Sequence, residues 1–160
     1  LTAAFVLCAD HGLNASTFAA RVVASTGASL QACLVAGLMA LSGPRHGTAS
    51  AAVHASLAHP LDPDGIGFSH PFYPHGDPRG EALLERCPPR GDLARRIQAM
   101  RPHGRPNLDV GLLAVCQAHG LPPDAGPRIF AVGRAVGWVA HVREQRADGR
   151  LIRPRARYDW

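Results

Sequence analysis

The sequence predicts an all-α fold, in which several helices pack together without a β-sheet. Apolar residues recur at helical spacing through most of the chain, while the strict alternation typical of strands is almost absent. Proline- and glycine-rich segments separate the helical stretches. With 160 residues and 46% hydrophobic content, the chain is long enough for one domain, or for one core and a small lobe.

The N-terminal quarter is expected to begin with two short helices. The apolar pattern predicts the first over Thr2–Ala9, followed by a polar loop that displays His11. The second helix is predicted over Phe18–Ser25, with Ser16 or Thr17 as its N-cap.

A long Ala- and Leu-rich run follows and leads to a displayed histidine. The run from Thr26 to Leu41 is predicted to be a helix buried on nearly all sides, ended by Gly43 and Pro44. His46 then lies near the start of a further helix, predicted over Ala49–Leu57. The partial positive charge of a helix N-terminus favours a neutral imidazole at such a position.

The segment from His59 to Pro78 is rich in proline, glycine, histidine and aspartate. We expect no regular element in it. It contains His70, His75 and the triplet Asp77-Pro78-Arg79. Long irregular loops in compact domains are often functional, so these residues are candidates for a site.

The second half is expected to be helical again, with three helical regions. One covers Arg79 to Met100, with an interruption at Pro88-Pro89, and the next starts at Asn107-Leu108-Asp109 and runs to His119. Asn107 or Asp109 could serve that helix only as a cap, which is the usual role of such residues at a helix start.

The last predicted helix covers Arg128 to Gln145, and glycines in it allow close approach to a neighbour. Its pattern places four apolar residues inward, namely Ile129, Val132, Val136 and Val139. A basic tail follows, from Arg150 to Trp160.

The charge composition favours an anionic small molecule as partner. The net charge is +5, and all 17 cationic side chains are arginines, whose planar fork suits carboxylates and phosphates. A genome rich in G and C would explain the absence of lysine equally well. The arginines are dispersed and few aromatic residues lie between them, so we expect no nucleic-acid surface.

Compartment and redox state follow from what the sequence contains. No stretch has the roughly 20 predominantly apolar residues of a membrane span, and no signal peptide is visible, so we expect a soluble cytoplasmic protein. The chain begins inside a predicted helix without a methionine, so we expect it to be a fragment. The scattered cysteines are expected to be buried reduced thiols, namely Cys8, Cys33, Cys87 and Cys116.

Several short motifs occur in the order found in one known family. They are Asp10-His11 before Asn14-Ala15-Ser16-Thr17, Gly43-Pro44-Arg45-His46-Gly47, Gly67-Phe68-Ser69-His70-Pro71, Asp77-Pro78-Arg79, Asn107-Leu108-Asp109, Gly133-Arg134-Ala135 before Gly137-Trp138, and Arg153-Pro154. Each is weak alone, but their common order is specific. Over nearly its whole length the chain resembles the C-terminal half of citrate synthase and 2-methylcitrate synthase.

The resemblance implies an acyltransferase of the tricarboxylic acid cycle type. Such an enzyme joins acetyl-CoA, or a close homologue, to oxaloacetate by enolisation and aldol-type condensation, followed by thioester hydrolysis. By resemblance, His46 polarises the thioester carbonyl, Asp109 removes the α-proton, and His70 polarises the keto oxygen of the acceptor. Proton abstraction next to a thioester does require a carboxylate base and stabilisation of the enolate charge.

The resemblance also assigns the binding groups of the acceptor. His11, Arg79 and Arg134 would hold its carboxylates, and Arg153 would reach a neighbouring active site across a homodimer interface. Fixed arginine forks suit a dicarboxylate. The expected partners are oxaloacetate, acyl-CoA and a second copy of the chain, with no membrane; no cofactor or metal is implied, because acetyl-CoA is a substrate.

The resemblance further implies a division into two parts. Residues 1–47 and 120–160 would belong to a large helical dimerisation domain, and 48–119 to a smaller lobe on the coenzyme A side. The lobe is shorter than the family pattern between His46 and His70, and the N-terminal half of the family fold is absent. Ser69 replaces a glycine, and Pro74 stands where many members place a lysine or arginine near the coenzyme.

Two other hypotheses remain at this stage. The chain could be a non-catalytic paralogue or fragment that retains a dicarboxylate site, which the shortened lobe favours. It could also be a metal protein that uses some of its nine histidines, with His70 and His75 or His54 and His59 as ligands.

Overall fold

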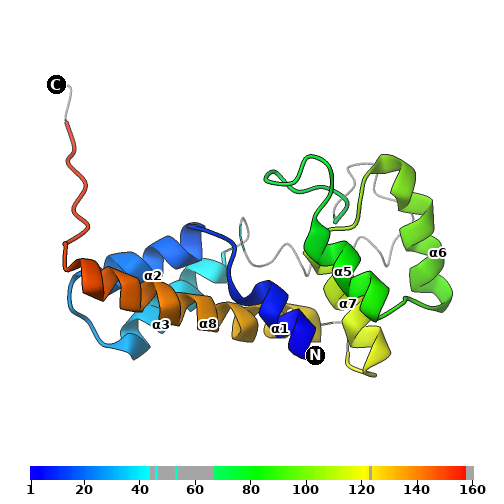
Figure 1. Ribbon diagram of the computed structural model, residues 1–160, viewed down its shortest axis with the longest axis horizontal. Coiled ribbons are helices and arrows are strands. Elements are labelled where there is room, and N and C mark those ends of the chain that lie inside the picture. Colours follow the sequence, from blue (N-terminus) through cyan, green and yellow to red (C-terminus); the bar gives the residue numbers. More distant parts are fainter. Residues whose placement is uncertain (44–45, 47–52, 54–66, 123, 158–160) are drawn as a thin grey trace.

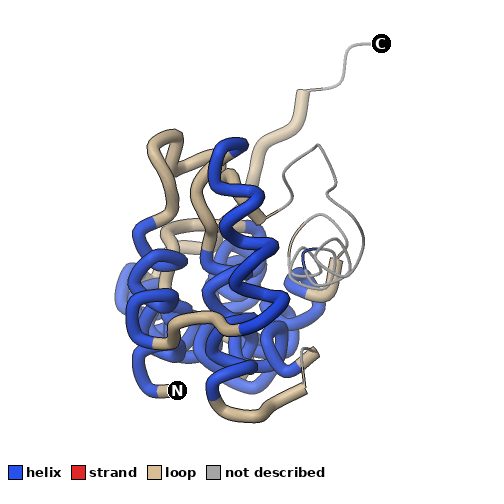
Figure 2. Tube along the Cα trace, turned by 90° about the vertical axis from the view of Figure 1, so that its right-hand side faces the viewer, coloured by secondary structure: helices blue, strands red, loops and turns tan. Residues whose placement is uncertain are grey.

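The computed structural model describes residues 1–43, 46, 53, 67–122 and 124–157 (Figure 1). Within these residues every regular element is helical and no strand occurs, as Figure 2 shows. This confirms the predicted all-α fold. The elements are α1 (Thr2–Ala9), α2 (Ala15–Ser25), α3 (Leu30–Leu41), α5 (Pro78–Arg86), α6 (Gly91–Met100), a short 3-10 turn (Arg101–His103), α7 (Leu108–Ala118) and α8 (Ala125–Asp148).

The long helix α8 organises the fold. It contacts α1, α2, α3 and α7, while α5 packs on α7. In Figure 1, α1, α2 and α3 lie along α8, and α5, α6 and α7 gather at the other end of the molecule. None of the described helices is long and apolar enough to cross a lipid bilayer.

A hydrophobic core connects the two groups of helices. Ala4 and Cys8 of α1 pack with Leu83 of α5, Leu112 of α7 and Ile129 of α8. Because four helices share these contacts, the α5–α7 group is held against α1 and α8. The division into a large domain and a smaller lobe stays a prediction.

Each group also has a core of its own. In one, Trp138 and Val142 of α8 pack with Cys33 and Leu41 of α3. In the other, apolar residues of α5, α6 and α7 surround the buried Val53, a residue of the helix predicted over Ala49–Leu57. The rest of that predicted helix lies outside the described residues.

The contact between α1 and α8 depends on a glycine. A Cβ atom at Gly137 would lie only 1.9 Å from the carbonyl oxygen of Ala9, so no other residue fits there. Because the face of α8 that carries Gly137 turns toward α1, the opposite face of α8 points to solvent. The prediction that four apolar residues of this helix point inward is therefore wrong in part. Ile129 is buried and Val139 is half-buried, but Val132 and Val136 are exposed.

The structure corrects the helix starts in the N-terminal part. Helix α2 begins three residues earlier than predicted, because Asn14 and not Ser16 or Thr17 is its N-cap: the Asn14 side chain accepts a hydrogen bond from the Thr17 N–H at 3.1 Å. Helix α3 begins only at Leu30, with Ser29 as its cap.

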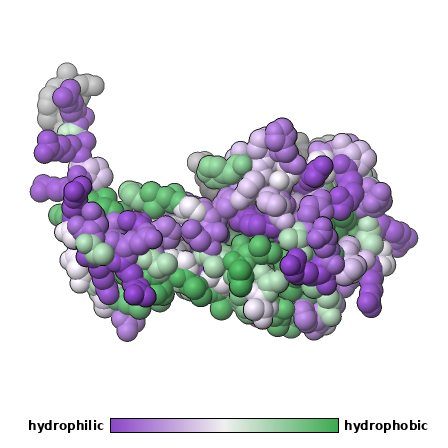
Figure 3. Space-filling model, viewed as in Figure 1, coloured by the Kyte–Doolittle hydropathy of each residue, from purple (hydrophilic) through white to green (hydrophobic). Residues whose placement is uncertain are grey.

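Helix α3 is also less buried than predicted. It packs through one narrow face, where Gly37 lies so close to Trp138 that an added Cβ would sit 2.9 Å from the indole ring. The other faces expose Val35, Leu38 and Met39. Apolar surface is also exposed at α1, through Val6 and through Leu1, which directly precedes the helix (Figure 3).

Helix α7 agrees with its prediction within one residue at each end, whereas α8 begins three residues earlier and ends three residues later than predicted. Helix α5 ends at Arg86 and α6 begins at Gly91, so the chain is interrupted at the two prolines as expected. Residues 67–77 form no helix or strand. The four cysteines are free; Cys87 is half-buried, whereas the expected burial holds for Cys8, Cys33 and Cys116.

Candidate active site

A cavity of about 420 Å³ lies where the α1–α2 loop, the loop of residues 67–77, and helices α5, α7 and α8 meet. Six of the seven predicted site residues line it: His11, His46, His70, Arg79, Asp109 and Arg134. The seventh, Arg153, is exposed in the tail after α8 and is absent from the lining. The fold thus brings residues from distant parts of the sequence to one place.

His46 is held at the N-terminus of α2. Its Nε2 accepts a hydrogen bond from the Ser16 backbone N–H at 3.3 Å, and the Ser16 Oγ lies 2.8 Å away. The Ser16 hydroxyl itself donates to Oδ1 of Asn14 at 2.8 Å, so the ring of His46 is tied to two residues at the start of α2. Burial and the charge of Arg134 lower the pKa of His46, which favours the neutral form.

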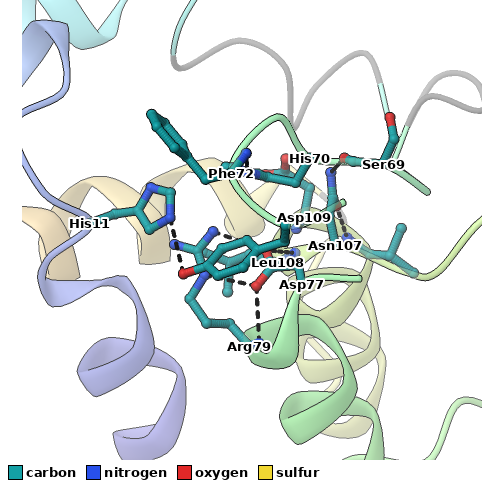
Figure 4. A network of polar contacts seen from close by, with 11 residues as sticks. His11, Ser69, His70, Phe72, Asp77, Arg79, Asn107, Leu108 and Asp109 are labelled. Carbon is teal, nitrogen blue, oxygen red and sulfur yellow. Dashed lines mark hydrogen bonds and ion pairs between the residues drawn. The ribbon is translucent and has the colours of Figure 1, made fainter. Parts of the chain in front are cut away.

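His11 and His70 belong to a cluster of rings. Their centroids are 5.0 Å apart, and Tyr73 packs beside both, at 5.4 Å from His11 and 5.2 Å from His70. The Tyr73 hydroxyl lies 3.2 Å from Nε2 of His11 (Figure 4). Nδ1 of His70 accepts from the Phe72 N–H at 3.2 Å, so a neutral His70 carries its proton on Nε2.

Both of these histidines are kept neutral by their surroundings. Burial, followed by the positive charge of Arg79, lowers the pKa of His70. The same two causes, with His70 as a third, lower the pKa of His11 from 6.5 to about 4. Neutral imidazoles donate hydrogen bonds without adding charge, so these rings are suited to polarise a carbonyl oxygen.

This pKa predicts how stability depends on pH. In the unfolded chain His11 takes up a proton near pH 6.5, whereas in the folded protein it does so only near pH 4. Between these two pH values the unfolded state therefore binds more protons than the folded state. Proton binding stabilises the unfolded state, so the free energy of unfolding decreases as the pH falls from 6.5 to 4.

We expect His11→Gln to make this pH dependence shallower. Denaturant unfolding of the full-length protein and the variant at several pH values measures it, and an NMR titration reports the ring directly. A His11 ring that gains its proton near pH 6.5 in the folded protein would contradict the prediction.

Arg79 is oriented by a buried carboxylate. Asp77, the N-cap of α5, accepts hydrogen bonds from Nε of Arg79 on Oδ1 and from Nη2 on Oδ2, each at 2.9 Å. Burial alone would raise the pKa of Asp77, but the bonds and charge of Arg79 outweigh it and keep this pKa below its ordinary value. The Tyr73 ring covers the guanidinium at 5.3 Å.

Arg134 is a buried cation on α8, only 1% exposed. Its Nε donates to the carbonyl oxygen of Cys8 at 2.8 Å, and its guanidinium lies 5.0 Å from the centre of the Phe130 ring. Its buried Nη1 has no hydrogen-bond partner in the part of the chain that the structure describes. A buried charge without a partner costs roughly several kcal/mol. An anion bound in the cavity next to Arg134 would remove this cost, so anion binding is favoured there.

Asp109 is the second residue of α7. The prediction left open whether it only caps this helix, and the structure gives that task to Asn107, whose Oδ1 accepts from the N–H groups of Asp109 at 3.0 Å and Val110 at 3.4 Å. The Asn107 amide also donates to the Ser69 carbonyl oxygen at 3.3 Å, which ties the loop of His70 to α7. A carboxylate in the first helical turn is stabilised as an anion.

Sequence reasoning gave four contributors no role in the site: Asn14, Ser16, Tyr73 and Asp77. Asn14 and Asp77 stand directly before helices, so the capping signal could have found them. Ser16 and Tyr73 meet the histidines only through the fold, and no local pattern indicates this.

The histidines do not form a metal centre in the described part of the chain. No group of three or more His, Cys, Asp or Glu side chains is placed there to hold an ion. Of the two histidine pairs considered as ligands, His54 and His59 lie outside the described residues.

Comparison with known proteins places this geometry in a family. The family model described as "Citrate synthase, C-terminal domain" matches residues 1–155. The citrate synthase of Haloferax volcanii is 38% identical over 97% of this chain and 48% of its own length. This chain thus spans about half the length of the relatives that it matches.

Solved structures agree with the sequence comparison. The crystal structure of citrate synthase from Thermotoga maritima superposes with a TM-score of 0.82 at 34% identity, covering 97% of this chain and 51% of that chain. The ternary complex of citrate synthase from Thermoplasma acidophilum with carboxymethyl coenzyme A and oxaloacetate gives a TM-score of 0.73 at 28% identity, covering 98% and 50%. By sequence and by fold, this chain belongs to the citrate synthase family.

Proposed function

We propose that this chain supplies the acceptor-binding and catalytic groups of an enzyme that condenses acetyl-CoA, or a close homologue, with oxaloacetate. The observation that carries the proposal is the convergence of three histidines, one carboxylate and two arginines on one cavity. The relative from Thermoplasma acidophilum was solved with oxaloacetate and a coenzyme A derivative, which supports the same two ligands here.

The acceptor would bind through its negative charges. A dicarboxylate needs two cationic contacts, and Arg79 and Arg134 both line the cavity. Arg134 has an unpartnered Nη1, and Arg79 is held in one orientation by Asp77. The Nε2–H of His70 would donate to the keto oxygen and make the adjacent carbon more electrophilic.

The donor would be activated by a base and a hydrogen-bond donor. Asp109 takes a proton from the α-carbon of the thioester, while an N–H of the His46 ring hydrogen-bonds the carbonyl oxygen where negative charge develops. The enolate carbon, with its charge held by His46, then attacks the keto carbon of the acceptor, whose oxygen takes a proton from the Nε2–H of His70. Water hydrolyses the resulting thioester and releases the tricarboxylate and the free thiol of coenzyme A.

We expect the full-length protein to release coenzyme A from acetyl-CoA only when oxaloacetate is present. Base and acceptor must both be in place for the enol to be captured, so thiol release depends on the second substrate. A thiol reagent follows the reaction, and isothermal titration measures oxaloacetate binding separately. Binding without thiol release would show a non-catalytic dicarboxylate site and refute the condensing activity.

The role proposed for Arg153 depends on a dimer. The side chain is exposed in the tail, which points away from the helices in Figure 1, so it can serve an active site only in a neighbouring copy. We expect the full-length protein to be a dimer and Arg153→Ala to raise KM for oxaloacetate about tenfold or more, the value of one charged hydrogen bond. Arg155→Ala in the same tail is the matched control; a monomer with full activity in sedimentation and assay would contradict this.

A further inference from the structure

Asp77 is the most completely bonded side chain of the network in Figure 4. Its carboxylate is fully buried, with 0% exposed surface. Oδ1 accepts from the N–H and the Nε of Arg79, at 3.0 and 2.9 Å, and Oδ2 accepts from Nη2 of Arg79 at 2.9 Å and from the Leu108 N–H at 3.0 Å. A buried carboxylate is costly without such partners, so its position and ionisation are tightly coupled to them.

The first consequence concerns Arg79. Asp77 occupies the Nε–Nη2 edge of the guanidinium, and the Tyr73 ring covers one face. Among the residues that the structure describes, no protein acceptor is found for Nη1, and Arg79 lines the cavity. Asp77 therefore fixes the rotation of the guanidinium and leaves Nη1 for a ligand.

The second consequence concerns the start of α7. Leu108 directly precedes Asp109, and its N–H is held by Asp77 rather than by the cap Asn107. The backbones of α5 and of residues 106–107 also touch, because a Cβ at Gly80 would lie 2.3 Å from the Asn107 carbonyl oxygen. One carboxylate thus joins the acceptor arginine to the helix that carries Asp109.

We propose that Asp77 is a positioning residue that holds Arg79 and Asp109 in one fixed arrangement, so that acceptor binding and proton abstraction both depend on it. Asp77 does not line the cavity, so it acts through these two residues and not on the substrates. The inference rests on the proposed function, because it uses the roles given there to Arg79 and Asp109.

The test is Asp77→Asn in the full-length protein. Asparagine has the same shape and still accepts on one oxygen, but its NH₂ group meets either the N–H and Nε of Arg79 or the Leu108 N–H and Nη2 of Arg79, donor against donor. We expect KM for oxaloacetate to rise and kcat to fall by about tenfold or more each, because small displacements of reacting groups have large effects on rate. The KM for acetyl-CoA should change less than about threefold, since its contacts are not among those removed.

A double-mutant comparison separates positioning from general damage. In an Arg79→Gln background, Asp77→Asn should no longer change KM for oxaloacetate but should still lower kcat through α7. Asp124→Asn is the matched control, since Asp124 also stands before a helix and pairs with an arginine, Arg128, at the surface. It should leave both constants unchanged.

Hydrogen exchange gives a readout that needs no activity. In Asp77→Asn the Leu108 amide should exchange about tenfold faster or more, because it loses its charged acceptor, while the Asp109 amide, capped by Asn107, should keep its rate. If Asp77→Asn fails to fold, Asp77→Glu serves instead; its longer side chain retains the charge for Arg79 but displaces Leu108, so kcat should fall while KM for oxaloacetate changes little.

The outcomes distinguish the two proposals. A folded Asp77 variant with wild-type kcat, KM and Leu108 exchange overturns the positioning role and leaves the condensing activity intact. A wild-type protein that releases no thiol refutes the proposed function, and the exchange of the Leu108 amide then still decides whether Asp77 holds α7.

Discussion

Asp109→Asn is expected to lower the rate of coenzyme A release from acetyl-CoA by about 10²–10⁴-fold, the usual contribution of a general base. The asparagine keeps the size of the side chain but cannot take a proton from the α-carbon. Helix α7 should still form, because Asn107 caps it and not Asp109. Oxaloacetate binding should therefore remain close to wild type, and isothermal titration measures it beside the thiol assay.

Asp92→Asn is the matched control for this variant. Asp92 is the second residue of α6, as Asp109 is of α7, but it is exposed, and within the described part of the chain it pairs with Arg95 and Arg96 at the surface. Such surface pairs contribute roughly 0–1 kcal/mol, so this variant should keep its activity. Wild-type thiol release by Asp109→Asn would refute the role of base, and equal losses in both variants would indicate a general effect of charge at helix starts.

The sequence predicts helices better than it predicts their faces. Proline and glycine stop a helix by local geometry, so the interruption between α5 and α6 is visible in the sequence. The face that a helix buries depends on its neighbour. On α8 the glycine side packs against α1, because Gly137 lets the Ala9 carbonyl approach, and the valine side is left exposed.

The same distinction applies to the candidate site. Motif order identified six residues that line the cavity, because each motif carries its chemistry within a few positions. Their supporting partners come from other segments: Ser16 meets His46, and Tyr73 meets His11. Such pairs follow from tertiary packing, which no local pattern reports.

Arg134→Lys is expected to raise KM for oxaloacetate by about 10²–10³-fold, because one or two hydrogen bonds to charged groups, worth about 1.5–3 kcal/mol each, are lost. Lysine keeps the charge, but its three donors lie on a single nitrogen and do not span the distance between the Cys8 carbonyl and a carboxylate at the Nη1 position, as the fork of Arg134 does. The rate at saturating substrate should change less than KM, since Arg134 is assigned to binding and not to proton transfer.

The control is Arg146→Lys, the same substitution further along α8. Arg146 also donates to a backbone carbonyl, that of Ala28 at 2.8 Å, but it is exposed and far along the helix from the cavity lining. Thermal melting of both variants measures how much stability is lost when an arginine that donates to a backbone carbonyl becomes lysine. An effect of Arg134→Lys on KM beyond the one seen in Arg146→Lys is then due to lost contacts with oxaloacetate. If Arg134→Lys bound oxaloacetate like wild type, the unpartnered Nη1 would not contact the substrate, and Arg79 and His11 would have to hold the dicarboxylate within this chain.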